Sequence, residues 1–212
     1  MKLKAIFFDF FGTLAFFPKK PNLAKLFELV TKLELDLDYR SFKKISQFVF
    51  KYLFFQAKSW DEGAKLIFEK IGEKPTKKIT KQVADYFKES FTFKFYKDVD
   101  SIKKLPFKKA ILTTAPKFLL SDLPLDGFDK ILTPTETKAL KPNPKAFSFA
   151  LKTFKVSPGQ VLMVGDDLER DIIPAKKLGI KTVLIDRDNK IKVKNSSIKK
   201  IRSLEELKKI VF

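Results

Sequence analysis

Short apolar runs that end at polar residues recur along the chain. The first, Ala5–Phe8, stops at a lone carboxylate, Asp9, and Gly12-Thr13 follow. A run of roughly four to eight apolar residues closed by a turn signal is typical of a buried strand in a parallel sheet. Similar runs predict strands at Ala110–Leu112, Lys130–Thr133, Gln160–Val164 and Lys181–Ile185. The chain therefore contains the elements of a parallel sheet.

Segments with the periodicity of amphipathic helices lie between the first predicted strand and the second. Four successive segments show it, with no strand between them: Leu23 to about Leu33, Tyr39 to Gln56, Ser59 to Ile71 and Thr76 to Phe91. Residues 16–95 are therefore expected to form an all-helical insertion.

Strands and helices alternate after that insertion. Helices are predicted at 98–105, 118–123, 144–154 and 168–178, and a capping box of Ser203 and Glu206 begins a last one. Repeated strand–helix units predict an α/β fold, in which residues 1–15 and 96–212 form a doubly wound parallel sheet with helices on both faces.

Composition narrows the chemistry that the chain can perform. Its 212 residues include neither cysteine nor histidine. Their absence excludes thiol nucleophiles, thiolate and histidine metal sites, and the Ser-His-Asp triad. Catalysis would have to use carboxylates, lysines, hydroxyls, backbone groups and a hard metal ion.

The chain is strongly basic, with a formal net charge of +19. Its lysines are scattered in pairs along amphipathic helices, without the aromatic interleaving of a single-strand nucleic-acid platform. We therefore expect no specific nucleic-acid partner.

The sequence shows no apolar stretch of about 20 residues and no signal-peptide pattern, so we expect a cytoplasmic protein without a membrane partner. Heavy lysine use without cysteine fits a thermophilic source, and the sequence does not distinguish a monomer from a homodimer.

Three predicted strands end in polar side chains that can converge. Asp9, Thr113 and Asp166 each follow a strand, and the carboxyl ends of parallel strands share one edge of the sheet. Lys141 begins a helix and would supply a cation, and Asp171 lies about one turn into the helix after Asp166. Clustered carboxylates raise each other's pKa unless a cation neutralises them. Mg²⁺ is the natural cation for a site of oxygen ligands.

This arrangement resembles the haloacid dehalogenase-like hydrolase superfamily over the whole chain. Four motifs carry the resemblance, in order: Asp9-Phe10-Phe11-Gly12-Thr13-Leu14, Thr113 in Ile-Leu-Thr-Thr, Lys141-Pro142-Asn143-Pro144, and Gly165-Asp166-Asp167 with Asp171 downstream. The resemblance implies a Rossmann-like core, a hydrolase activity and a cap domain formed by residues 16–95.

The resemblance also implies roles for individual residues. Asp9 would be the nucleophile and form a covalent aspartyl intermediate. Thr113 and Lys141, with Thr114 beside them, would bind the charged group of the substrate. Asp171 would complete the catalytic set, either by binding the metal indirectly or by orienting Lys141. Three groups would hold Mg²⁺: Asp9, Asp166 and the backbone carbonyl of Phe11.

One position departs from the family pattern. Phosphatases of the family usually carry a second Asp two residues after the nucleophile as general acid and base, and here that residue is Phe11. Without this acid, expulsion of an alkoxide should lose roughly 10²–10⁴-fold in rate. Aryl and acyl phosphates would suffer least. The family's 2-haloacid dehalogenases also carry an aromatic residue there, and a halide leaves without a proton.

Three functions follow from these observations. A Mg²⁺-dependent phosphatase acting on a small phosphorylated metabolite is favoured, because Gly165–Asp167 is rich in acids and Thr113-Thr114 lacks the Ser-Asn pair of the dehalogenases. A 2-haloacid dehalogenase is the alternative that Phe11 favours. The third is a non-catalytic basic binding protein on a hydrolase scaffold, motivated by Phe11 and the positive charge.

Overall fold

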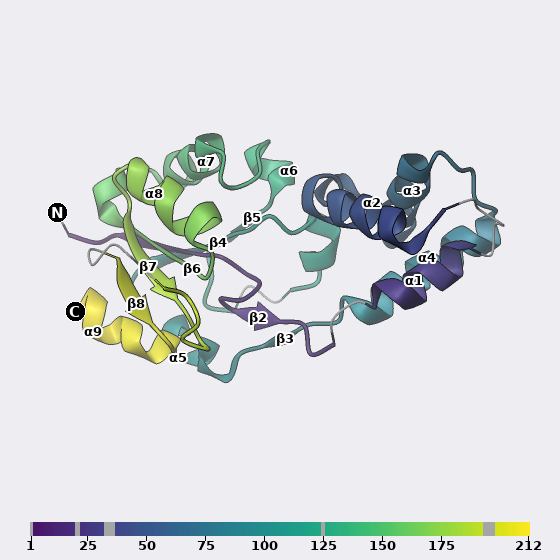
Figure 1. Ribbon diagram of the computed structural model, residues 1–212. Coiled ribbons are helices and arrows are strands. Elements are labelled where there is room, and N and C mark those ends of the chain that lie inside the picture. The colour runs from purple at the N-terminus through teal and green to yellow at the C-terminus, as the bar shows by residue number, and fades with distance from the viewer. Residues whose placement is uncertain (1, 20–21, 32–36, 124–125, 193–197) are drawn as a thin grey trace. The chain divides into compact units, whose positions relative to one another are not determined.

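The computed structural model describes residues 2–19, 22–31, 37–123, 126–192 and 198–212, and the chain divides into two compact units (Figure 1). One unit comprises Met1–Phe16, Lys94–Ala115 and Asp122–Phe212. The other comprises Phe17–Phe93 and Pro116–Ser121. Among the described residues, no helix has the length and apolar character needed to cross a membrane.

A six-stranded parallel sheet forms the centre of the first unit. Its strands are β1 (Ala5–Phe8), β4 (Lys108–Leu112), β5 (Lys130–Leu132), β6 (Val161–Gly165), β7 (Lys181–Ile185) and β8 (Lys199–Ile201). They lie in the order β5-β4-β1-β6-β7-β8, and every neighbouring pair is parallel. The chain winds outwards from β1 first to one side and then to the other, so the predicted doubly wound sheet is confirmed. Strand β8 was not predicted, because in Lys-Lys-Ile only Ile201 is buried.

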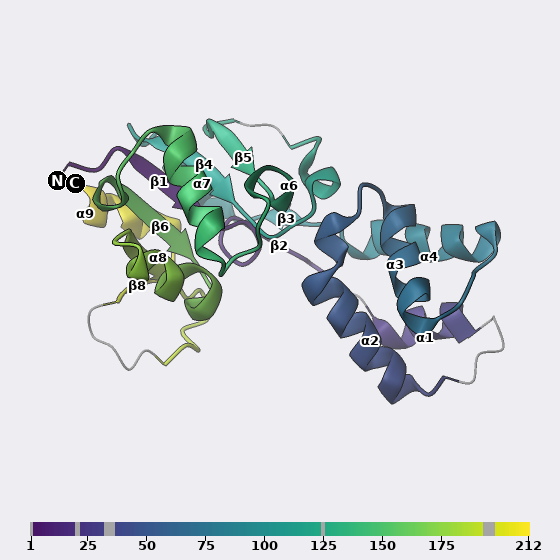
Figure 2. The same ribbon diagram turned by 90° about the horizontal axis from the view of Figure 1, so that it is seen from above.

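Helices cover both faces of this sheet (Figure 1, Figure 2). Helices α7 (Pro144–Phe154) and α8 (Ile173–Lys177) lie on one face, and α5 (Asp100–Lys103) and α9 (Lys208–Val211) on the other. Buried side chains of α7 and α8 pack on those of the central strands, among them Phe7, Leu112, Phe147, Phe154 and Met163. This apolar core fixes the strands whose ends carry the candidate site. The short helix α6 (Pro134–Thr137), which begins at a Thr133–Glu136 capping box, was not predicted.

The helix predicted at 168–178 begins as a wider turn. Residues Leu168–Ile172 form a π-helical turn, and α8 follows it. The Ile173 amide donates to the carbonyl of Leu168, five residues earlier. Pro174 has no amide hydrogen with which to continue a regular α-helical ladder, which explains the wider turn. Such turns occur frequently at functional sites.

A pair of short antiparallel strands lies in the first unit, where the chain leaves it and where it returns. Strand β2 (Ala15–Phe16) pairs with β3 (Lys94–Phe95), and the Tyr96 amide donates to the carbonyl of Leu14 at 2.9 Å. Neither strand was predicted. Two residues are too few to show the alternating pattern from which a strand is predicted.

The described part of the second unit is built from helices. They are α1 (Leu23–Thr31), α2 (Tyr39–Tyr52), α3 (Trp60–Ile71) and α4 (Lys77–Ser90). Each coincides with a predicted helix, although Leu33 lies outside the described residues and α2 gives way to a 3₁₀ turn at Phe54–Gln56. An aromatic cluster holds them together: Phe50, Phe54, Trp60, Phe87, Phe91 and Phe118. Phe118 explains why Pro116–Ser121 belongs to this unit.

Candidate active site

The carboxyl ends of three neighbouring strands bring the predicted site residues together. Asp9 follows β1, Thr113 follows β4 and Asp166 lies just beyond the last residues of β6. The Asp9 amide donates to the carbonyl of Val164 at 2.9 Å, which ties this residue to the neighbouring strand. A pocket of about 210 Å³ opens at this edge. Its lining residues are Asp9, Phe11, Thr113, Thr114, Lys141, Asp166, Asp167, Arg170 and Asp171, which include every predicted site residue.

Lys141 connects two of the carboxylates. Its Nζ donates to Asp9 Oδ1 at 2.6 Å and to Asp171 Oδ1 at 2.5 Å, and its side chain is only 2% exposed. Burial alone would lower the pKa of Lys141, but the carboxylates of Asp171 and Asp9 outweigh it and raise that pKa to about 12. Lys141 is therefore a permanent buried cation, which holds Asp9 and Asp171 in fixed positions.

Asp166 and Asp171 have unusual protonation properties. Burial, with the charges of Asp9 and Asp171, raises the pKa of Asp166 to about 7. Burial also raises the pKa of Asp171 to about 7, although the positive charge of Lys141 opposes this rise. In the described part of the chain, no side chain donates a hydrogen bond or forms an ion pair to Asp166. Among the described residues, Asp166 is thus a mostly enclosed carboxylate without a directly paired cation, although the nearby charge of Lys141 partly opposes the rise in its pKa.

The acids of this pocket suit a divalent cation. Carboxylate oxygens of Asp9, Asp166 and Asp171 all lie within 4.8 Å of one another. Among the side chains that line the pocket, four carboxylates stand against only two cations, Lys141 and Arg170. A hard divalent ion with oxygen ligands would balance the two remaining negative charges.

Two glycines give the carboxylates the space that they occupy. A Cβ on Gly12 would lie 2.0 Å from Asp166 Oδ2, and a Cβ on Gly165 would lie 2.4 Å from Asp171 Oδ2. Gly12 also has φ +87°, a backbone conformation that favours glycine. Any side chain at either position would push a carboxylate out of the cluster.

Arg187, which follows β7, braces the loop after Asp9. Its Nη1 and Nη2 donate to the two carboxylate oxygens of Asp98 at 2.8 and 3.1 Å, and Nη2 also donates to the carbonyl of Thr13 at 2.6 Å. Its guanidinium carbon lies 3.6 Å from the ring centroid of Tyr96. Burial would raise the pKa of Asp98, but the hydrogen bonds from Arg187 and from the start of the C-terminal helices bring it below its usual range. No local sequence pattern indicates this brace, because its residues are distant in the chain.

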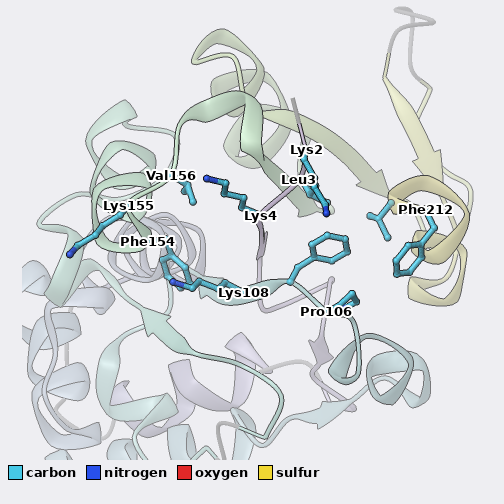
Figure 3. A pocket seen from close by; sticks show the side chains of 11 residues that line it. Lys2, Leu3, Lys4, Pro106, Lys108, Phe154, Lys155, Val156 and Phe212 are labelled. Atoms are coloured by element: carbon cyan, nitrogen blue, oxygen red, sulfur yellow. The ribbon is translucent and has the colours of Figure 1, made fainter.

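A wider pocket of about 790 Å³ lies at the opposite edge of the same sheet (Figure 3). Residues before β1 and β4 line it, including Leu3 and Phe107, and lysines such as Lys4 and Lys108 surround them. None of its lining residues carries a carboxylate or hydroxyl side chain. It therefore offers no carboxylate or hydroxyl nucleophile and no side-chain oxygen ligand for a hard metal ion.

Comparison with known families and curated proteins gives the following matches. A family model described as haloacid dehalogenase-like hydrolase matches residues 3–179. The chain is 45% identical over 58 residues to glyceraldehyde 3-phosphate phosphatase of Pyrococcus furiosus, which covers 27% of this chain and 24% of that protein. It is 32% identical over 96 residues to pyrophosphatase PpaX of Bacillus mycoides, which covers 42% of this chain and 44% of that one. The chain thus matches less than half of the length of each of these curated relatives.

Solved structures resemble the chain along its length. A HAD phosphatase from Thermococcus onnurineus has a TM-score of 0.70 and 26% identity, with 99% of this chain and 98% of that chain covered. A 2-haloacid dehalogenase from Pseudomonas syringae has the same TM-score and coverage at 18% identity. The second likeness shows the fold alone.

Replacing Gly12 by alanine should disturb the cluster beyond the cost of backbone strain. Gly72, with φ +88° and open space around its Cβ position, is the matched control. Both alanine variants should lose roughly 1–2 kcal/mol of stability from the left-handed conformation. A divalent ion bound by the cluster should raise the Tm of Gly72→Ala when Mg²⁺ is added. Gly12→Ala should show no such rise, because its Cβ displaces Asp166. An undiminished Mg²⁺ effect in Gly12→Ala would contradict this assignment.

The raised pKa values of Asp166 and Asp171 predict how stability depends on pH. These carboxyls bind protons more tightly in the folded chain, so their contribution is fully present below the ordinary carboxyl pKa of about 4. It is lost as the pH rises through about 7. Urea unfolding of the chelator-treated protein should therefore show a falling free energy of unfolding across this window. Asp166→Asn should flatten the fall, and an identical slope in both proteins would count against these pKa shifts.

Proposed function

The chain belongs to the family of haloacid dehalogenase-like hydrolases, and we propose that it is a Mg²⁺-dependent phosphatase that acts on a small phosphorylated molecule. The observation that carries this proposal is Asp166, an enclosed carboxylate close to Asp9 with no cationic side-chain partner among the described residues. A carboxylate of this kind can serve as a ligand for a divalent metal ion. The phosphatase names of the Pyrococcus relative and of the Thermococcus structure support the same reading.

Asp9 would act as the nucleophile. Lys141 binds its Oδ1, and no described residue donates a hydrogen bond to its Oδ2. An oxygen of Asp9 would attack phosphorus while the bond from phosphorus to the leaving oxygen breaks, and the leaving oxygen takes the electron pair. Water would then attack the phosphorus of the aspartyl phosphate, which releases phosphate and regenerates Asp9.

The other residues of the pocket would bind and orient. Thr113 Oγ1 accepts a hydrogen bond from the Ala115 amide, so its own proton is available for a phosphoryl oxygen. Thr114 lines the pocket beside it, and Asp171 would orient Lys141 through their hydrogen bond. Mg²⁺ would be held by Asp9, Asp166 and the backbone carbonyl of Phe11. When bound, it shields the nucleophile from the negative charge of the substrate.

Phe11 and the pocket size restrict the substrate. Phe11 lines the pocket but has no proton to give to a leaving group. Phosphates with good leaving groups, such as aryl and acyl phosphates, are therefore the expected substrates. The pocket volume of about 210 Å³ is below the roughly 300–1,000 Å³ of typical ligand sites, which favours a small molecule.

We further propose that residues 16–95 serve as the cap of this hydrolase. The support is a compact helical unit, Phe17–Phe93 with Pro116–Ser121, which the chain enters after β2 and leaves before β3. An insertion of this kind leaves the strand order of the core intact.

A 2-haloacid dehalogenase is the second candidate, and Phe11 is the observation that favours it. Asp9 would attack the carbon that carries the halogen, and the halide would leave with the bonding electrons. This reaction needs neither a proton donor nor a metal ion. In this reaction the negative charge of Asp166 would have no role. We therefore rank the dehalogenase second.

Hydrolysis of 4-nitrophenyl phosphate provides the direct test. The wild-type protein should release phosphate with Mg²⁺, and either chelation or Asp9→Asn should reduce the rate by at least about 10³-fold. Chelation would remove the ion that shields Asp9 from the charge of the phosphoryl group, and Asp9→Asn removes the nucleophile itself. Phosphate release that persists in chelator would refute the metal requirement. Chloride release from 2-chloropropionate in chelator, without phosphatase activity, would establish the second candidate instead.

Phe11→Asp should restore the missing proton donor. Its rate on an alkyl phosphate should rise by roughly 10²–10⁴-fold, while its rate on the aryl phosphate changes little, because only the alkoxide needs a proton. Phe11→Asn, of similar size but without an acid, is the control and should give no such gain. Equal gains on both substrates, or a gain in Phe11→Asn, would show that Phe11 limits the reaction in another way.

A further inference from the structure

We propose that Arg170 recognises a second anionic group, a carboxylate or a second phosphoryl group, on the substrate of this pocket. The proposal rests on the phosphatase function above and narrows its substrate class. Arg170 lies within the span of the fourth motif but received no role there, and the structure places it in the π-helical turn after β6, where it lines the pocket with Asp9 and Lys141.

Asp167 holds Arg170 from two sides. Its Oδ2 forms an ion pair with Arg170 Nε at 2.9 Å, and its Oδ1 accepts a hydrogen bond from the Arg170 amide at 2.9 Å. Neither contact uses Nη1 or Nη2, and no other contact of this guanidinium exists within the described residues. The side chain is 51% exposed, so its two Nη groups are accessible. The side chain is oriented in advance, which lowers the entropic cost of binding a ligand.

The charges of the pocket explain why the Nη groups would meet an anion. Lys141, the other cation that lines the pocket, is buried and already donates to Asp9 and Asp171. A phosphoryl group bound by Mg²⁺ and Thr113, as proposed above, would leave the Nη groups of Arg170 for a second anionic group. A planar guanidinium matches a carboxylate or phosphoryl group in a two-pronged hydrogen bond. Because the pocket is small, this second group should lie only a few bonds from the phosphorus.

The test measures binding of three probes by isothermal titration in the presence of Mg²⁺. Methylphosphonate carries one phosphoryl-like group, phosphonoacetate adds a carboxylate and methylenediphosphonate adds a second phosphonate. The wild-type protein should bind at least one of the last two about tenfold or more tightly than methylphosphonate, as expected for a charge-assisted hydrogen bond. The probe with the larger preference identifies the second group.

Arg170→Met should reduce that preference to within about twofold of unity, and Arg170→Lys should retain part of it. Arg202→Met is the matched control, since Arg202 is an exposed arginine of the same unit that does not line the pocket, and it should keep the wild-type preference. Binding needs no turnover, so a preference without phosphatase activity would refute the proposed function and leave the anion site standing. Equal affinities for the three probes in the wild type, no binding of any probe, or an unchanged preference in Arg170→Met would overturn the inference.

Discussion

The candidate site depends on one buried lysine shared between two carboxylates. Lys141 lies between Asp9 and Asp171, with a side chain that is almost fully enclosed. A lone charge buried in this way would be costly, and the paired acids repay that cost only while both remain in contact with it. Asp166 belongs to the same cluster, but Lys141 donates its hydrogen bonds to Asp9 and Asp171 and none to Asp166. The surplus of negative charge is what suits this ion-pair network to a divalent ion as well.

The rest of the first unit holds this unfavourable arrangement in place. The parallel strands β1 and β6 lie side by side, so Asp9 and Asp166, which follow them, are neighbours. The apolar contacts of α7 hold this helix, which begins just after Lys141, in place. Gly12 admits the carboxylate of Asp166, and Arg187 fastens the loop that contains Gly12. Stability is thereby concentrated in the scaffold, while the site itself carries desolvated and mutually repelling charges. This division is expected where function requires a strained electrostatic arrangement.

The sequence predicted what short patterns can encode. The apolar run before Asp9, the helical spacing of α2 to α4 and the Gly165-Asp166 turn each contain their own signal, so the doubly wound sheet and most of the residues lining the pocket were predicted. Strands β2, β3 and β8 were missed, because segments of two or three residues are too short to show a strand pattern. Arg187 and Arg170 were missed for other reasons. Their contacts arise only when distant segments meet, or when a helix begins as a π-turn.

In the proposed phosphatase, a metal ion held near Asp9 would compensate the charge of the substrate, and Phe11 would limit only the substrates whose leaving group needs a proton. Isothermal titration of Mg²⁺ into the chelator-treated protein at pH 7, in two buffers of different ionisation enthalpy, tests this most directly. It should show one ion bound per chain with release of protons, because the ion displaces protons from carboxyls whose pKa is near 7. In Asp166→Asn both the affinity and the proton release should fall sharply. Absence of binding to the wild-type protein, or equal binding to Asp166→Asn, would contradict the account.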